Sequence, residues 1–163
     1  MKAFVSYAID DQDEFVPTFI AEQLRQENFA VTSSYYEYRG KLKTETKQGI
    51  RAAHLYIGLI TANGMEKNRV LHEYNFARKE NIPTLLLSED TIKIDPDVAK
   101  QGNVVFFNRQ KPERAKSIIQ RKLTNHGKEP NINKQDTYAW MLGGRAMKSI
   151  LNFLVKIGSH QRF

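Results

Sequence analysis

The sequence contains no cysteine, which excludes disulfide bonds and thiolate metal sites. The four histidines (His54, His72, His126 and His160) are not spaced as ligands of one metal ion, so no metal site is expected. The chain also has no Walker A motif, Gly-x-Gly-x-x-Gly turn, His-Glu-x-x-His pair or Gly-x-Ser-x-Gly elbow. These absences disfavour simple nucleoside triphosphatases, classical dinucleotide dehydrogenases, zinc proteases and serine hydrolases.

Long apolar runs are scarce as well. Acidic residues follow the first apolar run too early for a signal peptide, and charged residues interrupt the last predicted helix too often for a membrane span. We therefore expect a cytoplasmic protein that does not contact a membrane. The formal net charge of +7 favours an anionic partner, whether a nucleotide, a nucleic acid or an acidic protein.

Five short runs rich in apolar and β-branched residues predict strands over residues 2–7, 29–33, 54–60, 82–87 and 103–107. Helices are expected to begin at the acidic cluster 10–14, with Phe15 on the apolar face, and to cover residues 45–53, 68–77 and 112–123. Strands that alternate with helices predict an α/β fold with a parallel sheet covered on both faces. Ligands of such sheets bind beyond the carboxyl ends of the strands.

The C-terminal part of the chain has a different character. Residues 126–136 are polar and read as a linker between a domain of residues 1–125 and a helical extension of residues 137–163. Within the extension, apolar or small residues recur at steps of four and three: Trp140, Gly144, Met147, Leu151, Leu154 and Gly158. This seam fits packing on the same domain and contact with a second subunit equally well, and Gly143–Gly144 predicts a bend or a close backbone approach.

Glu73 is the strongest candidate for chemistry. It lies at the margin of the apolar helical face formed by Val70, Tyr74 and Ala77, where a carboxylate can be partly desolvated and directed into a cleft. The loops that follow the first three strands, after Tyr7, Ser34 and Thr61, should surround that cleft. The alternative is an ordinary solvated glutamate paired with Arg69 one turn earlier.

Three segments resemble signatures of the TIR (Toll/interleukin-1 receptor) domain family, in the correct order. Residues 3–7 (Ala-Phe-Val-Ser-Tyr), followed by acidic residues, are similar to its first signature. Residues 34–40 resemble its BB loop, and residues 69–77, followed by Asn81-Ile-Pro83, resemble the helix that carries its catalytic glutamate. The resemblance covers about residues 1–125.

The resemblance implies a flavodoxin-like three-layer fold with five parallel strands. It implies that Glu73 is catalytic and cleaves the nicotinamide–ribose bond of NAD, in the manner of a bacterial antiviral-defence enzyme. No cofactor is expected beyond NAD as substrate, and the partners would be other TIR surfaces and a separate sensor or effector protein. The residues assigned to NAD binding are Tyr7, Ala8, Tyr35, Tyr38, Arg39, Asn63 and Arg69.

Arg69 departs from the family pattern, because such enzymes commonly carry tryptophan four residues before the glutamate. Tyr7, Tyr35 or Tyr38 are candidates for a substitute aromatic surface. The basic loop residues Arg39, Lys41 and Lys43 fit either a contact with the pyrophosphate of NAD or a solvated loop. Glu66 and Glu80, near the two ends of the same helix as Glu73, are expected to be dispensable for chemistry.

Two other functions are compatible with the sequence. A non-enzymatic adaptor that works by TIR–TIR assembly is favoured by Arg69 in place of tryptophan and disfavoured by Glu73. Binding to nucleic acid is suggested by six basic residues, which are Arg109, Lys111, Arg114, Lys116, Arg121 and Lys122. This last hypothesis is weak because no aromatic residues interleave with them.

Overall fold

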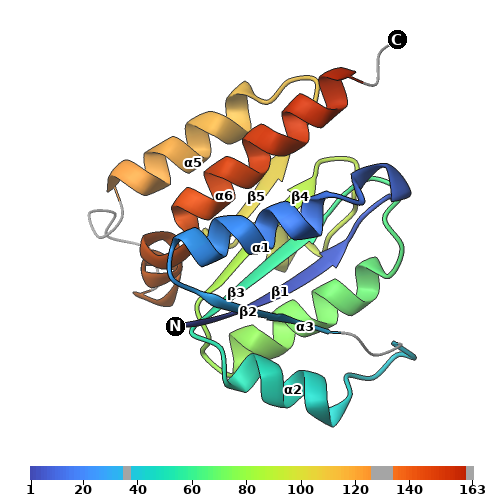
Figure 1. Cartoon of the computed structure of the whole chain (residues 1–163), viewed down its shortest axis with the longest axis vertical. Helices are drawn as coiled ribbons and strands as arrows, with labels where there is room; N and C mark the ends of the chain where they lie inside the picture. Colours follow the sequence, from blue (N-terminus) through green and yellow to red (C-terminus); the bar gives the residue numbers. More distant parts are fainter. Residues whose placement is uncertain (35–37, 126–133, 161–163) are drawn as a thin grey trace.

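The protein is a five-stranded parallel sheet with helices on both faces, as seen in a computed structural model of the chain (Figure 1). The structure describes residues 1–34, 38–125 and 134–160. The strands are β1 (Lys2–Ala8), β2 (Ala30–Ser33), β3 (Leu55–Ile60), β4 (Thr84–Glu89) and β5 (Val104–Phe107), in the order β2-β1-β3-β4-β5. This confirms the predicted flavodoxin-like α/β fold.

The strand order explains the burial pattern in the sequence. Strand β3 is central and pairs in parallel with β1 and β4, so all six of its residues are buried. Such a strand reads as a continuous apolar run. The edge strand β2 pairs with β1, and its residues alternate between exposed and half-buried.

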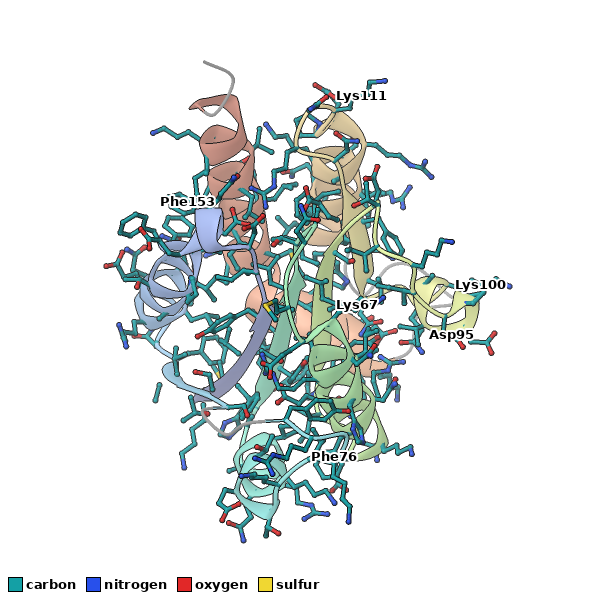
Figure 2. All side chains as sticks on the ribbon, turned by 90° about the vertical axis from the view of Figure 1, so that its right-hand side faces the viewer. Lys67, Phe76, Asp95, Lys100, Lys111 and Phe153 are labelled. Atoms are coloured by element: carbon teal, nitrogen blue, oxygen red, sulfur yellow. The ribbon has the colours of Figure 1, made fainter. Side chains whose placement is uncertain are left out.

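Helices cover the two faces of the sheet unequally. Helix α2 (Thr44–Arg51) and helix α3 (Lys67–Lys79) lie on one face, whereas α1 (Val16–Gln26), α5 (Glu113–Asn125) and α6 (Lys134–His160) lie on the other (Figure 1). A short helix, α4 (Pro96–Ala99), precedes β5 and has no counterpart in the sequence prediction. Figure 2 shows Phe76 where α3 meets α2, and the cationic groups of Lys47 and Arg51 lie over its ring.

The first helix begins later than the acidic cluster predicted. Residues Asp11–Asp13 form a separate 3-10 turn, in which the backbone N–H of Gln12 donates to the Asp10 side chain. Helix α1 starts only at Val16. Phe15 therefore does not join the apolar face: it is 68% exposed, and Val16 is buried in its place.

Helix α6 belongs to the core of the domain. Its Trp140, Met147, Leu151 and Leu154 are buried among residues of α1, α5 and the sheet. Phe153, which is labelled in Figure 2, stacks on Phe19 of α1. Two glycines allow this close packing. A Cβ atom on Gly143 would lie 2.7 Å from Leu55, and one on Gly144 would lie 2.5 Å from Leu123.

The start of α6 is fixed by polar contacts. Trp140 donates its indole N–H to the carbonyl of Gly102 at 3.2 Å, and Asp136 forms an ion pair with Arg78 of α3. The helix begins at Lys134, inside the segment predicted as a linker; residues 126–133 of that segment lie outside the described residues. The division into domain, linker and extension stays a prediction.

Within residues 1–34, 38–125 and 134–160, no helix combines the length and apolar character needed to cross a lipid bilayer.

Candidate functional site

Glu73 lies at the interface between helix α3 and strand β1, where its side chain has no exposed surface. Because side chains alternate along a strand, Phe4, Ser6 and Ala8 of β1 face α3, and Ser6 comes directly under the carboxylate. The Ser6 hydroxyl donates a hydrogen bond to Oε2 of Glu73. Glu73 is thus a buried carboxylate held in place by the sheet.

Arg69 covers Glu73 from one turn earlier on the same helix. Its Nη1 lies 3.3 Å from both carboxylate oxygens of Glu73 and 3.4 Å from the Ser6 hydroxyl. Its Nη2 donates to the carbonyl of Tyr7 at 2.7 Å, and its Nε donates to Glu66 at 3.0 Å. The predicted pairing of Arg69 with Glu73 is present, but the pair is buried rather than solvated.

Burial and neighbouring charges have opposite effects on the pKa values of Glu73 and Arg69. Burial raises the pKa of Glu73 above its ordinary value, and the hydrogen bond from Ser6 and the charge of Arg69 oppose this rise without cancelling it. Burial would lower the pKa of Arg69, but the carboxylates of Glu73 and Glu66 outweigh it and the pKa is raised. Tyr56 of β3 has a pKa well above its ordinary value because it is buried and because Glu73 is near.

The segment after β2 approaches the same helix. The Tyr38 hydroxyl lies 3.1 Å from Nδ1 of His72, and the two rings meet edge to face. A hydrogen bond involving Ser34 contributes to lowering the pKa of Glu73. Arg39 is exposed, and Tyr35 lies outside the described residues.

Other residues assigned to NAD binding occupy different environments. The side chain of Tyr7 packs against the apolar cluster on the α1 and α6 face, so Tyr7 contributes its carbonyl to the Glu73 cluster and no aromatic surface. Ala8 is buried, and its carbonyl accepts the N–H of Thr61 at 2.9 Å. Asn63 is exposed and has a left-handed backbone, with φ 62°.

Gly64 fixes the loop between β3 and α3 against the end of β1. A Cβ atom at this position would lie 2.3 Å from the carbonyl oxygen of Ala8, a backbone atom that cannot move aside cheaply. The loop therefore passes over β1 at a distance that only glycine permits.

Gly64→Ala is expected to lower the free energy of unfolding by about 1–3 kcal/mol, because the added methyl group forces two backbone segments apart. Denaturant unfolding measures the loss. Gly102→Ala is the matched control, since its Cβ would meet only the end of the Lys122 side chain at 3.6 Å. Equal stability of the two variants would contradict the close approach.

A second charged cluster connects the loops at the carboxyl ends of the strands. Arg109 donates to both carboxylate oxygens of the buried Asp13, at 2.8 and 2.7 Å, and to Glu89 at 3.1 Å. Glu89 in turn accepts the N–H of Ala62. Arg109 is therefore engaged inside the protein, which removes one of the six basic residues that suggested nucleic-acid binding.

Sequence reasoning did not connect Ser6 with Glu73, or Asp13 and Glu89 with Arg109. A signal for Ser6 was present, because it is the one hydroxyl residue among the apolar positions of β1 that face α3. Asp13, Glu89 and Arg109 come from three separate segments, so no local spacing could connect them.

The arrangement suits a reaction in which the Glu73 carboxylate stabilises a developing positive charge. Among the described residues, no group of three or more His, Asp or Glu side chains is placed to hold a metal ion. A buried, ionised Glu73 would stabilise a positive charge that develops beside it far more strongly than an exposed carboxylate would.

Comparison with known proteins points to one family. The profile of the family described as TIR domain matches residues 3–123. No curated protein sequence matches the chain. Two solved structures are distantly similar in shape. One is a 2-deoxyribosyltransferase from the psychrotolerant bacterium Bacillus psychrosaccharolyticus, with 15% identity, a TM-score of 0.45, and 66% of this chain and 86% of that chain covered.

The other is the TIR domains of the activated Roq1 resistosome, which directly recognizes the pathogen effector XopQ. It has 11% identity and a TM-score of 0.42, and the match covers 93% of this chain and 83% of that chain.

Proposed function

Because this chain belongs to the TIR domain family, we propose that it is an enzyme that cleaves the nicotinamide–ribose bond of NAD at Glu73. The supporting observation is that Glu73 is a fully buried carboxylate. It is held by Ser6 near the carboxyl end of strand β1, and parallel α/β proteins bind ligands beyond the carboxyl ends of their strands. NAD is the substrate, and no further cofactor is required.

The reaction needs little beyond a well-placed negative charge. The bond between C1′ of the ribose and the nicotinamide nitrogen breaks, and its electron pair leaves with nicotinamide, which departs as a neutral molecule. The ribose becomes an oxocarbenium-like cation that the Glu73 carboxylate stabilises. Water then attacks C1′ and releases a proton to solvent, giving ADP-ribose; an internal or second acceptor would give a cyclic or conjugated product.

Ser6 has a positioning role in this proposal. Its hydroxyl donates to Oε2 of Glu73, which fixes the orientation of the carboxylate and favours its ionised form. The product would serve as a nucleotide signal, or the loss of NAD would itself be the effect, in antiviral defence. A separate protein would detect the infection or receive the product.

A second candidate function is a non-enzymatic adaptor acting through TIR–TIR assembly. One observation favours it: Arg69 lies against both oxygens of Glu73 and neutralises the charge on which catalysis would depend. If the Arg69–Glu73 pair never opens, Glu73 is a structural residue.

The purified protein is expected to consume NAD, with a specific activity that rises as the protein concentration is raised. In related enzymes a neighbouring TIR subunit completes the NAD pocket, and the segment after β2 is both polar and aromatic, a composition suited to such a contact. The measurement is NAD consumption at several protein concentrations, with the products separated by mass.

A constant specific activity over a wide dilution range would indicate a pocket complete within one stable unit. Failure to consume NAD at any concentration would favour the adaptor.

A further inference from the structure

The contacts of Arg69 close the access to Glu73. All three guanidinium nitrogens donate hydrogen bonds. Nη1 donates to Glu73 and Ser6, Nη2 donates to the carbonyl of Tyr7, and Nε donates to Glu66. The guanidinium thus spans from strand β1 to the start of α3, across the carboxylate. A ribose carbon cannot come beside Glu73 while these contacts persist.

Exposure increases outward along this cluster. The side chain of Glu73 is 0% exposed, that of Arg69 is 10% exposed, and that of Glu66 is 45% exposed. Arg69 therefore lies between a buried carboxylate and one that faces solvent. Turning outward, the guanidinium would leave Glu73, Ser6 and Tyr7 while keeping a carboxylate partner in Glu66.

The closed arrangement also opposes the charge of the proposed substrate. The nicotinamide ring of NAD is cationic, and a guanidinium 3.3 Å from the carboxylate offsets the attraction that Glu73 would exert on it. The diphosphate of NAD has the opposite effect, because guanidinium groups bind phosphate oxygens in a bidentate manner. A dinucleotide thus carries a group able to draw Arg69 away from Glu73.

We propose that Arg69 is a specificity-determining and positioning residue, which keeps Glu73 closed until the diphosphate of the substrate draws the guanidinium outward. This inference rests on the proposed cleavage of NAD at Glu73. A ligand shifts such an equilibrium only by its preference for one state, and here the open state alone presents Arg69 to the diphosphate. The enzyme would accordingly select dinucleotides over nicotinamide ribosides, although both contain the bond that is cleaved.

The first test compares kcat/KM for NAD with kcat/KM for nicotinamide riboside, which has the same bond and the same cationic ring but no phosphate. The parent protein is expected to prefer NAD strongly. In Arg69→Met this preference should shrink by about tenfold or more, the effect of losing a charge-assisted hydrogen bond, with nicotinamide riboside cleaved faster than by the parent. Arg69→Lys keeps a positive charge beside Glu73 and so disturbs the fold less. Its preference for NAD over nicotinamide riboside should lie between those of the parent and Arg69→Met.

Arg51→Met is the matched control. Arg51 is an arginine of α2 that pairs with Glu80 at the other end of α3, so its replacement should leave the preference unchanged. If Arg69→Met and the parent show the same preference for NAD, the inference about Arg69 is wrong and the cleavage of NAD at Glu73 still stands. A slower reaction with both substrates, in equal proportion, would reduce Arg69 to a structural support and would also overturn the inference.

A second test does not depend on turnover. Carbodiimide coupling of an amine to Glu73, followed by mass spectrometry, reports whether the carboxyl group is accessible. Inorganic pyrophosphate should increase the labelling of Glu73 in the parent and leave it unchanged in Arg69→Met. Glu80, which is partly exposed and lies at the C-terminal end of the same helix, is an internal control whose labelling should not respond. Labelling of Glu73 that ignores pyrophosphate in the parent would refute the role of Arg69, even in a protein that never cleaves NAD.

Discussion

Glu73→Gln is expected to lower the rate of NAD cleavage by ~10²–10³ or more, the usual effect of removing one preorganised electrostatic stabiliser. The substitution retains the size of the side chain and an oxygen that accepts the hydrogen bond from Ser6. Arg69 keeps its contacts with Tyr7 and Glu66. The fold should therefore persist while the charge that stabilises the ribosyl cation is lost. Mass-resolved NAD consumption at equal protein concentration gives the comparison.

The control for this variant is Glu80→Gln. Glu80 makes a partly exposed ion pair with Arg51, an interaction worth about 0–1 kcal/mol, and lies at the far end of α3. The sequence suggested Glu66 as a second control. Glu66 is unsuitable for that purpose because it accepts a hydrogen bond from Arg69. Retention of full activity in Glu73→Gln would show that Glu73 does not carry the chemistry.

The dependence of activity on pH provides a second test of the role of Glu73. Burial raises the pKa of Glu73, and only its ionised form stabilises a cation. Activity of the parent should therefore decline with falling pH at values above the ordinary pKa of a glutamate. The residual activity of Glu73→Gln should lack this decline.

The order of elements was predictable from the sequence because each one is a local pattern. The apolar run ending at Ile60 is long and uninterrupted, as expected of a central parallel strand, and it forms β3 with every residue buried. The acidic cluster was less informative. Negative charge near a helix start is favourable wherever it sits in the first turn, so composition alone could not separate the 3-10 turn at Asp11–Asp13 from the start of α1.

The surroundings of Glu73 were only partly predictable. Helical spacing placed Arg69 one turn before Glu73, but spacing does not reveal whether such a pair faces solvent or the sheet. That depends on Ser6, which lies 67 residues away in the chain and meets Glu73 only after β1 and α3 have packed together. Contacts made by tertiary packing leave no local trace in the sequence.

For helix α6 the sequence left two alternatives open, and the structure favours one of them. The seam from Trp140 to Leu154 fitted either the domain core or a subunit contact. In the structure its residues are buried within one chain, against α1, α5 and the sheet, and Gly143 permits the helix to approach Leu55 and Leu85 closely. The helix therefore completes the core on the face opposite Glu73.

Leu151→Asp is expected to abolish cooperative folding or to cost at least about 4 kcal/mol of the free energy of unfolding, a large share of the 5–15 kcal/mol of a typical domain. Leu151 is 1% exposed, so the substitution both removes buried apolar surface and places a carboxylate within the apolar core. Met141→Asp is the matched control, because Met141 lies on the same helix and is 58% exposed; its effect should stay within about 0.5 kcal/mol. Urea unfolding and size-exclusion chromatography of both variants give the measurement. A folded Leu151→Asp protein with the unfolding midpoint of the parent would mean that α6 is not part of the core, and a change in oligomeric mass alone would assign the seam to a subunit contact.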